Sequence, residues 1–447
     1  MTAHNLPDLA DALLSAARKA GAEAADVLVV DGTSVSIDVR EGALEEATRS
    51  EGVDLGLRVL MGKRQSCVSA SDTHPETLRE MAERAVAMAR IAPEDADVGL
   101  ADPDQLVTVI PDLDLADATA EPDPEALQAD ALAAEAAAAR VAGVTQVQSA
   151  SAAYGARRLH LAATNGFSQG YARTDRTISC VAISGEGTGM ERDYDYDSRV
   201  YQSDLRDAAE IGRIAGDRAV ERHGARKPAT GTYPVLFDER VASSLVGHLV
   251  AAVNGTMIAR GSSWLRDALG AQVLPEGLSL IEDPHRPRIP GSRPFDAEGL
   301  PTARRAIVDD GRLTGWTLDL ATARKLGMQS TASASRGTGA PPSPGVSNLA
   351  LTQSDRTRAD LIADMGTGLI VTSMIGSTIN PNTGDYSRGA SGLWVENGEI
   401  AYPVNECTIA GNLREMLLRI QPANDARGHL SRVVPSILID GMTLAGS

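Results

Sequence analysis

The 447-residue sequence lacks a cysteine framework and a long apolar run. Its cysteines are Cys67, Cys180 and Cys407, an odd number at wide spacing that suits neither paired disulfides nor a CxxC metal pair. The longest apolar stretches, such as 25–30 and 369–371, are far shorter than the roughly 20 residues that span a bilayer. We expect no signal peptide before the first polar helix. We therefore expect a soluble, cytoplasmic protein without a membrane partner.

Basic residues are also scarce. The chain has 42 Lys and Arg against 60 Asp and Glu, which gives a formal net charge of -18. Nucleic acids select basic surfaces, and the sequence shows no local basic groove, so we expect no nucleic-acid partner. At about 150 residues per domain, the length predicts roughly three domains or two larger ones.

Motifs for phosphate binding, serine hydrolysis and metal binding are missing. The sequence has no GxxxxGK[ST] phosphate loop and no GxSxG nucleophile elbow. A catalytic zinc site takes three ligands from His, Cys, Asp or Glu, yet no two of the seven His lie within five residues of each other. We therefore expect no cofactor and no metal.

The first half of the chain predicts two α-β-α units. In a domain over 1–92, hydrophobic periodicity predicts helices over 6–20 and from Pro75, with strands at 25–30, 35–39 and 53–59. In a domain over 126–227, the same order predicts helices over 126–142 and about 205–219, around strands at 145–154, 158–163 and 177–184. The repeated order suggests a duplication, and two unrelated α+β units explain it equally well.

The rest of the chain predicts a linker and a third domain. Residues 93–125 hold five prolines and eleven Asp or Glu with no Lys or Arg, which is typical of a solvated acidic linker. Residues 228–447 have one early helix, from Asp238 to about Asn254, and then many short apolar runs punctuated by Gly and Pro. This pattern predicts a β-rich domain with an antiparallel sheet or barrel, so the expected fold class is α+β.

Two sets of side chains are candidates for a catalytic or metal-binding role. His248 is the one His inside a strongly predicted helix, where a lone His on an apolar face is more often a core residue than a ligand. Asp296 and Glu298 lie two residues apart between prolines. Close carboxylates suit acid–base work or cation binding, and turn formation is the commoner role in such a context.

A peptide-binding edge is a further candidate. Gly376, Asn380 and Gly384 belong to a turn-rich segment in which glycine lets another backbone approach closely. Extended peptides bind by adding a strand to a sheet edge, so we expect such an edge near residues 376–386. A plain loop explains the same residues equally well.

Eight short segments together carry a resemblance to a known family. They are GAEAADV (21–27), KPATG (227–231), GSSWL (261–265), FDAEG (295–299), ARKLG (323–327), NPNTGDYSRG (380–389), ENGE (396–399) and TIAGN (408–412). In this order, over nearly the whole chain, they resemble the TldD/PmbA family, and more specifically its PmbA branch, also called TldE. The resemblance implies a duplicated α+β region before a β-rich C-terminal domain.

The same resemblance allows a prediction about metal binding. The TldD branch looks like a zinc peptidase with an HExxxH helix, in which two His bind zinc and the Glu activates water. Over this motif the chain has Ser243 in place of the first ligand, Ser244 in place of the general base, and His248 as the one retained position. The third ligand is expected to be a cysteine near the C-terminus, and none follows Cys407. We predict no metal site, no catalytic residue and no autonomous peptidase activity.

The resemblance implies a non-catalytic subunit that pairs with a TldD-like catalytic subunit in a zinc metallopeptidase degrading or maturing unfolded peptides. One alternative is a metal-free, peptide-binding homodimer, the form we expect of the isolated chain. Another is an independent hydrolase that uses Ser244 with His248, four residues apart on one helical face. A serine on a helix surface without oxyanion donors is a poor nucleophile site, which disfavours this last alternative.

Overall fold

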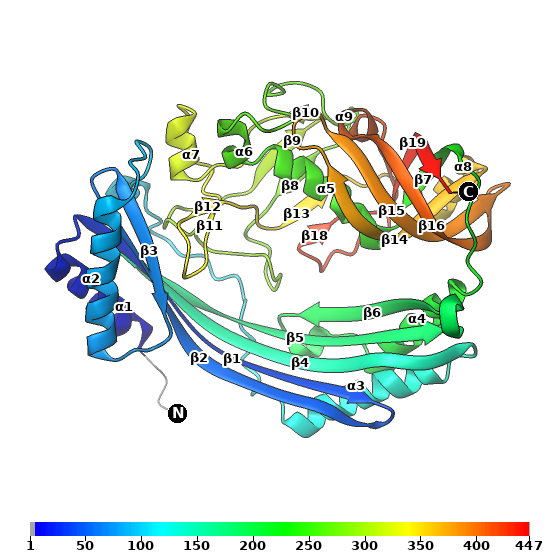
Figure 1. Cartoon of the computed structure of the whole chain (residues 1–447), viewed down its shortest axis with the longest axis horizontal. Coiled ribbons are helices and arrows are strands. Elements are labelled where there is room, and N and C mark those ends of the chain that lie inside the picture. Colours follow the sequence, from blue (N-terminus) through cyan, green and yellow to red (C-terminus); the bar gives the residue numbers. More distant parts are fainter. Residues whose placement is uncertain (1–4, 447) are drawn as a thin grey trace.

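A long, curved antiparallel sheet forms the N-terminal half of the computed structural model, which describes residues 5–446 (Figure 1). Its strand order is β3-β2-β1-β4-β5-β6. The strands are β1 (Ala24–Arg40), β2 (Ala43–Met61), β3 (Arg64–Ala70), β4 (Val144–Ala163), β5 (Ser168–Ser184) and β6 (Glu191–Arg199). The strands of both predicted α-β-α units therefore lie in one sheet, joined where β1 pairs with β4. The predicted α+β fold class is confirmed.

Strands β1 and β4 are each longer than the sequence predicts. β1 continues through residues 31–34 and β4 through residues 155–157, where the hydrophobic alternation pauses. The predicted breaks at these positions are wrong. Both strands are interior, so neighbours on each side satisfy their backbone N–H and C=O groups even where the side chains are polar.

Helices α1 to α4 cover one face of this sheet. α1 (Leu6–Ala20) and α2 (Pro75–Ile91) pack over Val27 and Val29 of β1, and α3 (Pro124–Ala139) and α4 (Ala208–Glu221) pack near Val35 and Ile37. Side chains alternate along a strand, so the even-numbered residues of β1 point to the opposite face. That face is concave, and the C-terminal domain lies over it (Figure 1).

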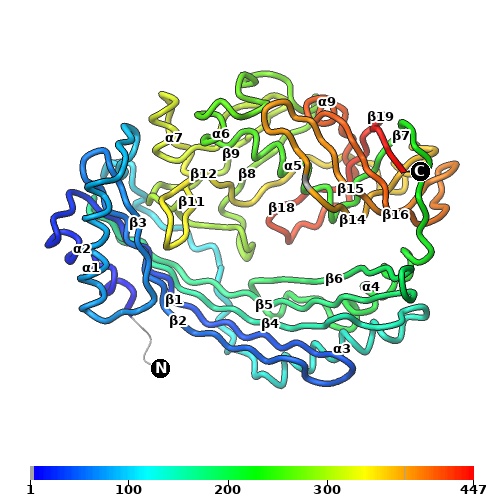
Figure 2. Tube along the Cα trace, viewed as in Figure 1, coloured from blue at the N-terminus to red at the C-terminus, as the bar shows by residue number. Residues whose placement is uncertain are grey.

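The acidic segment 93–125 is not a solvated linker throughout. Val98, Ala101, Leu113 and Leu115 are buried. The backbone N–H of Thr174 donates to the carbonyl of Leu115 at 3.0 Å, which ties the segment to β5. Figure 2 shows the trace of this segment leading from α2 to α3. The solvated prediction is wrong here because the acidic residues alternate with apolar side chains that bind both halves of the molecule.

The C-terminal domain is built around a barrel-like sheet. Its order is β16-β15-β14-β7-β19-β17, and an additional pairing of β16 with β19 closes a ring. The strands are β7 (Gly231–Phe237), β14 (Gly368–Ile379), β15 (Asp385–Glu396), β16 (Glu399–Asn412), β17 (Gln421–Pro422) and β19 (Ile437–Ala445). Helix α5 (Glu239–Ala252) packs Leu245 and Leu249 into the same core as Val235 and Val371.

Shorter elements complete the C-terminal domain. One sheet contains β8 (Leu280–Glu282), β9 (Arg305–Asp309), β10 (Arg312–Leu313), β13 (Leu349–Leu351) and β18 (Arg432–Val433), and β11 (Ala334–Ser335) pairs with β12 (Ser343–Pro344). The short helices are α6 (Gly255–Ala259), α7 (Leu320–Lys325), α8 (Arg358–Met365) and α9 (Leu413–Leu417). Across residues 5–446, the helices are too short or too polar to cross a membrane.

Candidate functional site

Helix α5 carries the three positions that the resemblance aligns with the zinc motif. Asp238 caps it, because the carboxylate accepts a hydrogen bond from the backbone N–H of Arg240 at 3.2 Å. Leu245 is fully buried in the barrel core, whereas Ser243 and Ser244 line a cavity. The helix is therefore an intact structural element, and it carries Ser243 and Ser244 at the positions that the resemblance aligns with the first zinc ligand and the general base.

The cavity beside α5, which we call the α5 cavity, has a volume of about 950 Å³. The barrel contributes residues 372–375 of β14, 388–391 of β15 and 405–408 of β16, and the curved sheet contributes residues 192–194 of β6. The α5 cavity thus lies where the two halves of the chain meet. Its lining mixes hydroxyl groups with the guanidinium groups of Arg192, Arg222, Arg240 and Arg388.

Ser244 and His248 do not form a hydrogen-bonded dyad. Within residues 5–446, neither Ser244 Oγ nor His248 Nε2 has a hydrogen-bond partner, although both atoms are buried. The imidazole packs edge-on to Tyr386, with ring centroids 5.8 Å apart. Burial, and then the charge of Arg388, lower the pKa of His248, so the ring is neutral near pH 7. This geometry gives the independent-hydrolase alternative no support.

The donors at the α5 cavity do not fit a catalytic zinc site. Cys407 lines the same cavity, a proximity that was not predicted. Its thiol donates a hydrogen bond to the carbonyl of Ala390 at 3.2 Å, and burial raises the pKa of this thiol to about 11. Zinc needs the thiolate, and serine hydroxyls are not among its usual ligands. Among the described side chains, no three from His, Cys, Asp and Glu gather as a metal site. The metal-free state stays a prediction for the purified protein.

An aspartate ladder, formed by Asp193, Asp195 and Asp197 of β6, borders the α5 cavity. All three side chains are buried. Their partners are Arg222 and Arg240 for Asp193, Arg206 and Arg218 for Asp195, and Arg199 and Arg206 for Asp197. Arg240 belongs to α5 and lies 2.8 Å from Asp193, so the ladder joins the curved sheet to the helix. It was not predicted, although the alternation Asp-Tyr-Asp-Tyr-Asp places three carboxylates on one face of a strand.

The residues predicted to bind peptide lie near one end of β14 and β15. Gly376 is in β14 with φ of 70°, and its carbonyl accepts a hydrogen bond from Arg388 Nε at 2.8 Å. Asn380 and Gly384 form the turn between the two strands, where the N–H of Gly384 donates to the carbonyl of Asn380 at 2.8 Å. Beyond Val371, the side of β14 that faces away from β15 pairs with no strand in the described chain. Peptide binding by these residues stays a prediction.

Asp296 and Glu298 do not line the α5 cavity. Asp296 accepts hydrogen bonds from the backbone N–H groups of Glu298, Leu300 and Ala334 at 2.9 to 3.1 Å. Glu298 accepts one from the N–H of Leu320, at the start of α7, at 2.8 Å. These contacts fit the turn-forming alternative. Burial, and then the charges of Asp296 and Asp319, raise the pKa of Glu298 to about 8.

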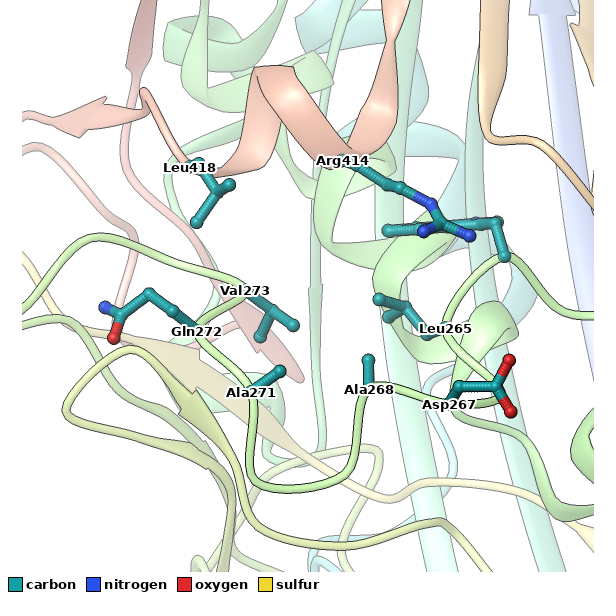
Figure 3. Close-up of a pocket in the computed structure, with 9 residues that line it drawn as sticks. Leu265, Asp267, Ala268, Ala271, Gln272, Val273, Arg414 and Leu418 are labelled. Atoms are coloured by element: carbon teal, nitrogen blue, oxygen red, sulfur yellow. The ribbon is translucent and has the colours of Figure 1, made fainter.

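A smaller cavity, of about 300 Å³, lies beside α9, which contributes Arg414 to its lining (Figure 3). Leu265, Ala268, Val273 and Leu418 give it an apolar lining, and Arg414 and Asp267 lie at its rim (Figure 3). Asp267 pairs with its exposed neighbour Arg266 at 2.9 Å. The cavity therefore offers apolar contact but no arrangement of groups suited to peptide hydrolysis.

Three family models match consecutive parts of the chain, all of the metallopeptidase class. They are PmbA/TldA metallopeptidase domain 1 over residues 25–89, the central domain over 117–222 and the C-terminal domain over 230–446. The Metalloprotease PmbA of Escherichia coli O157:H7 is 37% identical over 428 residues, which cover 95% of this chain and 92% of that protein. The Haemophilus influenzae homolog is 36% identical and covers 96% and 94%. The chain belongs to the PmbA/TldD family.

Solved structures agree with this assignment. A Bacteroides thetaiotaomicron protein described as a modulator of DNA gyrase superposes with a TM-score of 0.90 at 27% identity, over 100% of both chains. TldE from Thermococcus kodakarensis superposes with a TM-score of 0.83 at 19% identity, over 98% of this chain and 99% of that one. The second likeness shows a shared fold.

Proposed function

We propose that the chain is the non-catalytic subunit of a cytoplasmic zinc metallopeptidase, acting with a TldD-like partner that carries the HExxxH helix. The observation that carries this proposal is the chemistry of α5. By the resemblance, Ser243 and Ser244 stand in place of the first zinc ligand and the general base, and both line the α5 cavity. His248 is neutral and packed against Tyr386. One imidazole and two hydroxyls do not supply the three ligands that catalytic zinc takes.

Peptides in an unfolded state are the proposed substrate of the complex. The relatives in Escherichia coli and Haemophilus influenzae are named metalloproteases, which supports proteolysis as the activity to which this chain contributes. The side of β14 that pairs with no strand of the described chain beyond Val371 supports binding of an extended peptide, because strand addition uses main-chain groups and tolerates many sequences. A net charge of -18 supports a partner other than nucleic acid.

Reconstitution with a TldD-like subunit tests the proposal. The chain, the partner and their equimolar mixture are each assayed for bound zinc and for cleavage of an unfolded peptide. We expect zinc in the partner and the mixture, cleavage in the mixture, and neither in this chain alone. Stoichiometric zinc together with cleavage in this chain alone would overturn the proposal.

Two controls separate this proposal from its alternatives. Ser244→Ala in this chain leaves cleavage by the mixture unchanged, whereas a hydrolase that uses Ser244 loses activity. Light scattering with and without the partner distinguishes a heteromer from the homodimer expected of the isolated chain. A homodimer that binds peptide and ignores the TldD-like subunit would favour the peptide-binding alternative.

A further inference from the structure

A further cavity, of about 460 Å³, lies between the concave face of the sheet and loops of the C-terminal domain. We call it the concave-face cavity. Its apolar floor consists of cross-strand neighbours from β1 and β4, with Val30 beside Leu159 and Leu28 beside Leu161. Phe295 from the C-terminal domain lies against Tyr171 of β5, with ring centroids 5.5 Å apart and the rings edge to face. The cavity is therefore built by both halves of the chain.

Two arginines at this cavity have N–H groups without an acceptor. The side chain of Arg336 is fully buried, and its Nη1 pairs with Asp26, but its Nη2 has no hydrogen-bond partner in the described structure. Arg293 donates through its two Nη atoms to the carbonyls of Ala334 and Gly345, and its buried Nε has no partner there either. Buried polar groups are nearly always hydrogen-bonded, so these N–H groups indicate a missing acceptor.

The charged side chains around the cavity also indicate an anionic ligand. Arg157 and Arg173 of the curved sheet add two more guanidinium groups to its lining. Arg173 donates to the carbonyl of Ser292 at 2.8 Å, and no ion pair joins it to a carboxylate among residues 5–446. The carboxylate in the lining is that of Asp296, and both of its oxygens already accept backbone N–H groups. Arg157, Arg336 and Arg293 have carboxylate partners in Asp175, Asp26 and Glu282. Arg173 is the lining guanidinium group without one in the described chain, and it favours a ligand that carries a negative charge.

We propose that the concave-face cavity binds a carboxylate that carries an apolar group. The guanidinium groups that line the cavity bind the carboxylate, and the apolar group lies on the floor formed by β1 and β4. A cavity of this size with an apolar lining and a few polar groups is typical of small-ligand sites, and charge-assisted hydrogen bonds to arginine are strong and specific. The site is separate from the α5 cavity and does not depend on a TldD-like partner.

Two kinds of ligand share this chemistry: the C-terminal residue of a peptide and a free amphipathic acid. Calorimetric titration of the full chain with N-acetyl-alanyl-leucine, with its C-terminal amide and with hexanoate tests the proposal and separates the two. We expect the peptide acid to bind about tenfold or more tightly than the amide, because the amide lacks the charge that the arginines bind. Binding of hexanoate equal to that of the peptide acid assigns the site to free acids, and much weaker binding assigns it to peptide C-termini.

A matched pair of substitutions locates the binding. Val30→Phe fills the floor and lowers the affinity for the acid about tenfold or more. Ser34→Phe adds the same ring to the same face of β1, at an exposed position outside the cavity, and leaves the affinity unchanged. A second variant, Arg173→Gln, leaves the floor intact. It lowers the affinity for the acid several-fold and leaves the affinity for the amide unchanged.

Three results overturn the proposal. They are equal binding of acid and amide, no binding of any ligand up to about 10 mM, and unchanged affinity in a folded Val30→Phe protein. The proposal is also contradicted if Arg173→Gln lowers the affinity for the acid and for the amide equally.

Discussion

The curved sheet meets the C-terminal domain through two ion-pair networks that are built differently. In the first, which we call the Asp26 cluster, one carboxylate binds Arg58 of β2 and Arg336 of the C-terminal domain, and all three side chains are at most 4% exposed. In the aspartate ladder, three carboxylates share several arginines, of which Arg206 and Arg218 keep about a quarter of their side chains exposed. The first network depends on a single buried carboxylate, whereas the second is redundant and partly hydrated.

This difference decides what each network does for stability. Burial alone raises the pKa of Asp26, and the two guanidinium groups outweigh burial, so the pKa lies below its usual value. A buried ion pair adds little net stability, but removal of one partner leaves an uncompensated buried charge. The Asp26 cluster should therefore be sensitive to a single substitution, and the aspartate ladder should tolerate one better.

Asp26→Asn is the substitution with the largest expected effect. It leaves Arg58 and Arg336 buried without a counter-charge, which costs about 3 to 5 kcal/mol of unfolding free energy. Urea denaturation measures the loss. The matched control is Asp217→Asn, which breaks an exposed pair with Arg213 and costs about 0.5 kcal/mol or less. Similar losses in both variants would contradict a special role for the Asp26 cluster.

Asp195→Asn tests the aspartate ladder. Its partners Arg206 and Arg218 reach solvent, and Arg206 also contacts Asp197, so part of the lost interaction is replaced. We expect a loss of about 1 to 3 kcal/mol in the same denaturation experiment. A loss equal to that of Asp26→Asn would show that redundancy does not protect the ladder.

Glu298 gives the region around the Asp26 cluster a pH response. Its folded pKa of about 8 lies above the unfolded value, so the native state holds an extra proton between them and stability falls as pH rises toward 8. Glu298→Gln keeps an acceptor for the N–H of Leu320 and removes up to about 1.4 kcal/mol per pH unit of this slope. Denaturation midpoints of both proteins between about pH 5 and 9 measure the difference. Parallel curves would mean that Glu298 ionises normally.

His429 should show the smallest effect. It lies 3.5 Å from Asp197, but burial and then the charge of Arg199 lower the pKa of His429, so it is neutral at pH 7. His429→Gln therefore changes the unfolding free energy by about 0.5 kcal/mol or less at that pH. A loss above about 1 kcal/mol would show a charged His429 that belongs to the ladder.

Sequence patterns within short segments predicted the structural features that depend on neighbouring residues. The helix from Asp238 and the β-rich C-terminal domain follow from caps and from short apolar runs, and the structure confirms both. The continuity of the curved sheet was missed because hydrophobic alternation reports the burial of side chains and not the pairing of backbones. The packing of segment 93–125 was missed because overall charge concealed its apolar residues.

The sequence predicted the part of the candidate site that depends on which residue stands at a single motif position. Ser243 and Ser244 could be compared with a motif residue by residue. Asp26 and Arg336 are 310 residues apart, and Cys407 is brought near α5 by the pairing of β16 with β15 and β19. Neither proximity has a local signal, since both depend on how distant strands assemble.

The position of β19 has a consequence for synthesis of the protein on the ribosome. This last strand pairs with both β7 and β16 and so completes the barrel, whereas every strand of the curved sheet ends by Arg199. The curved sheet can therefore assemble during translation, while the barrel keeps two unpaired strand edges until residues 437–445 emerge. Unpaired edges invite association with other chains, so a chain truncated before Ile437 should aggregate even though its first half is complete.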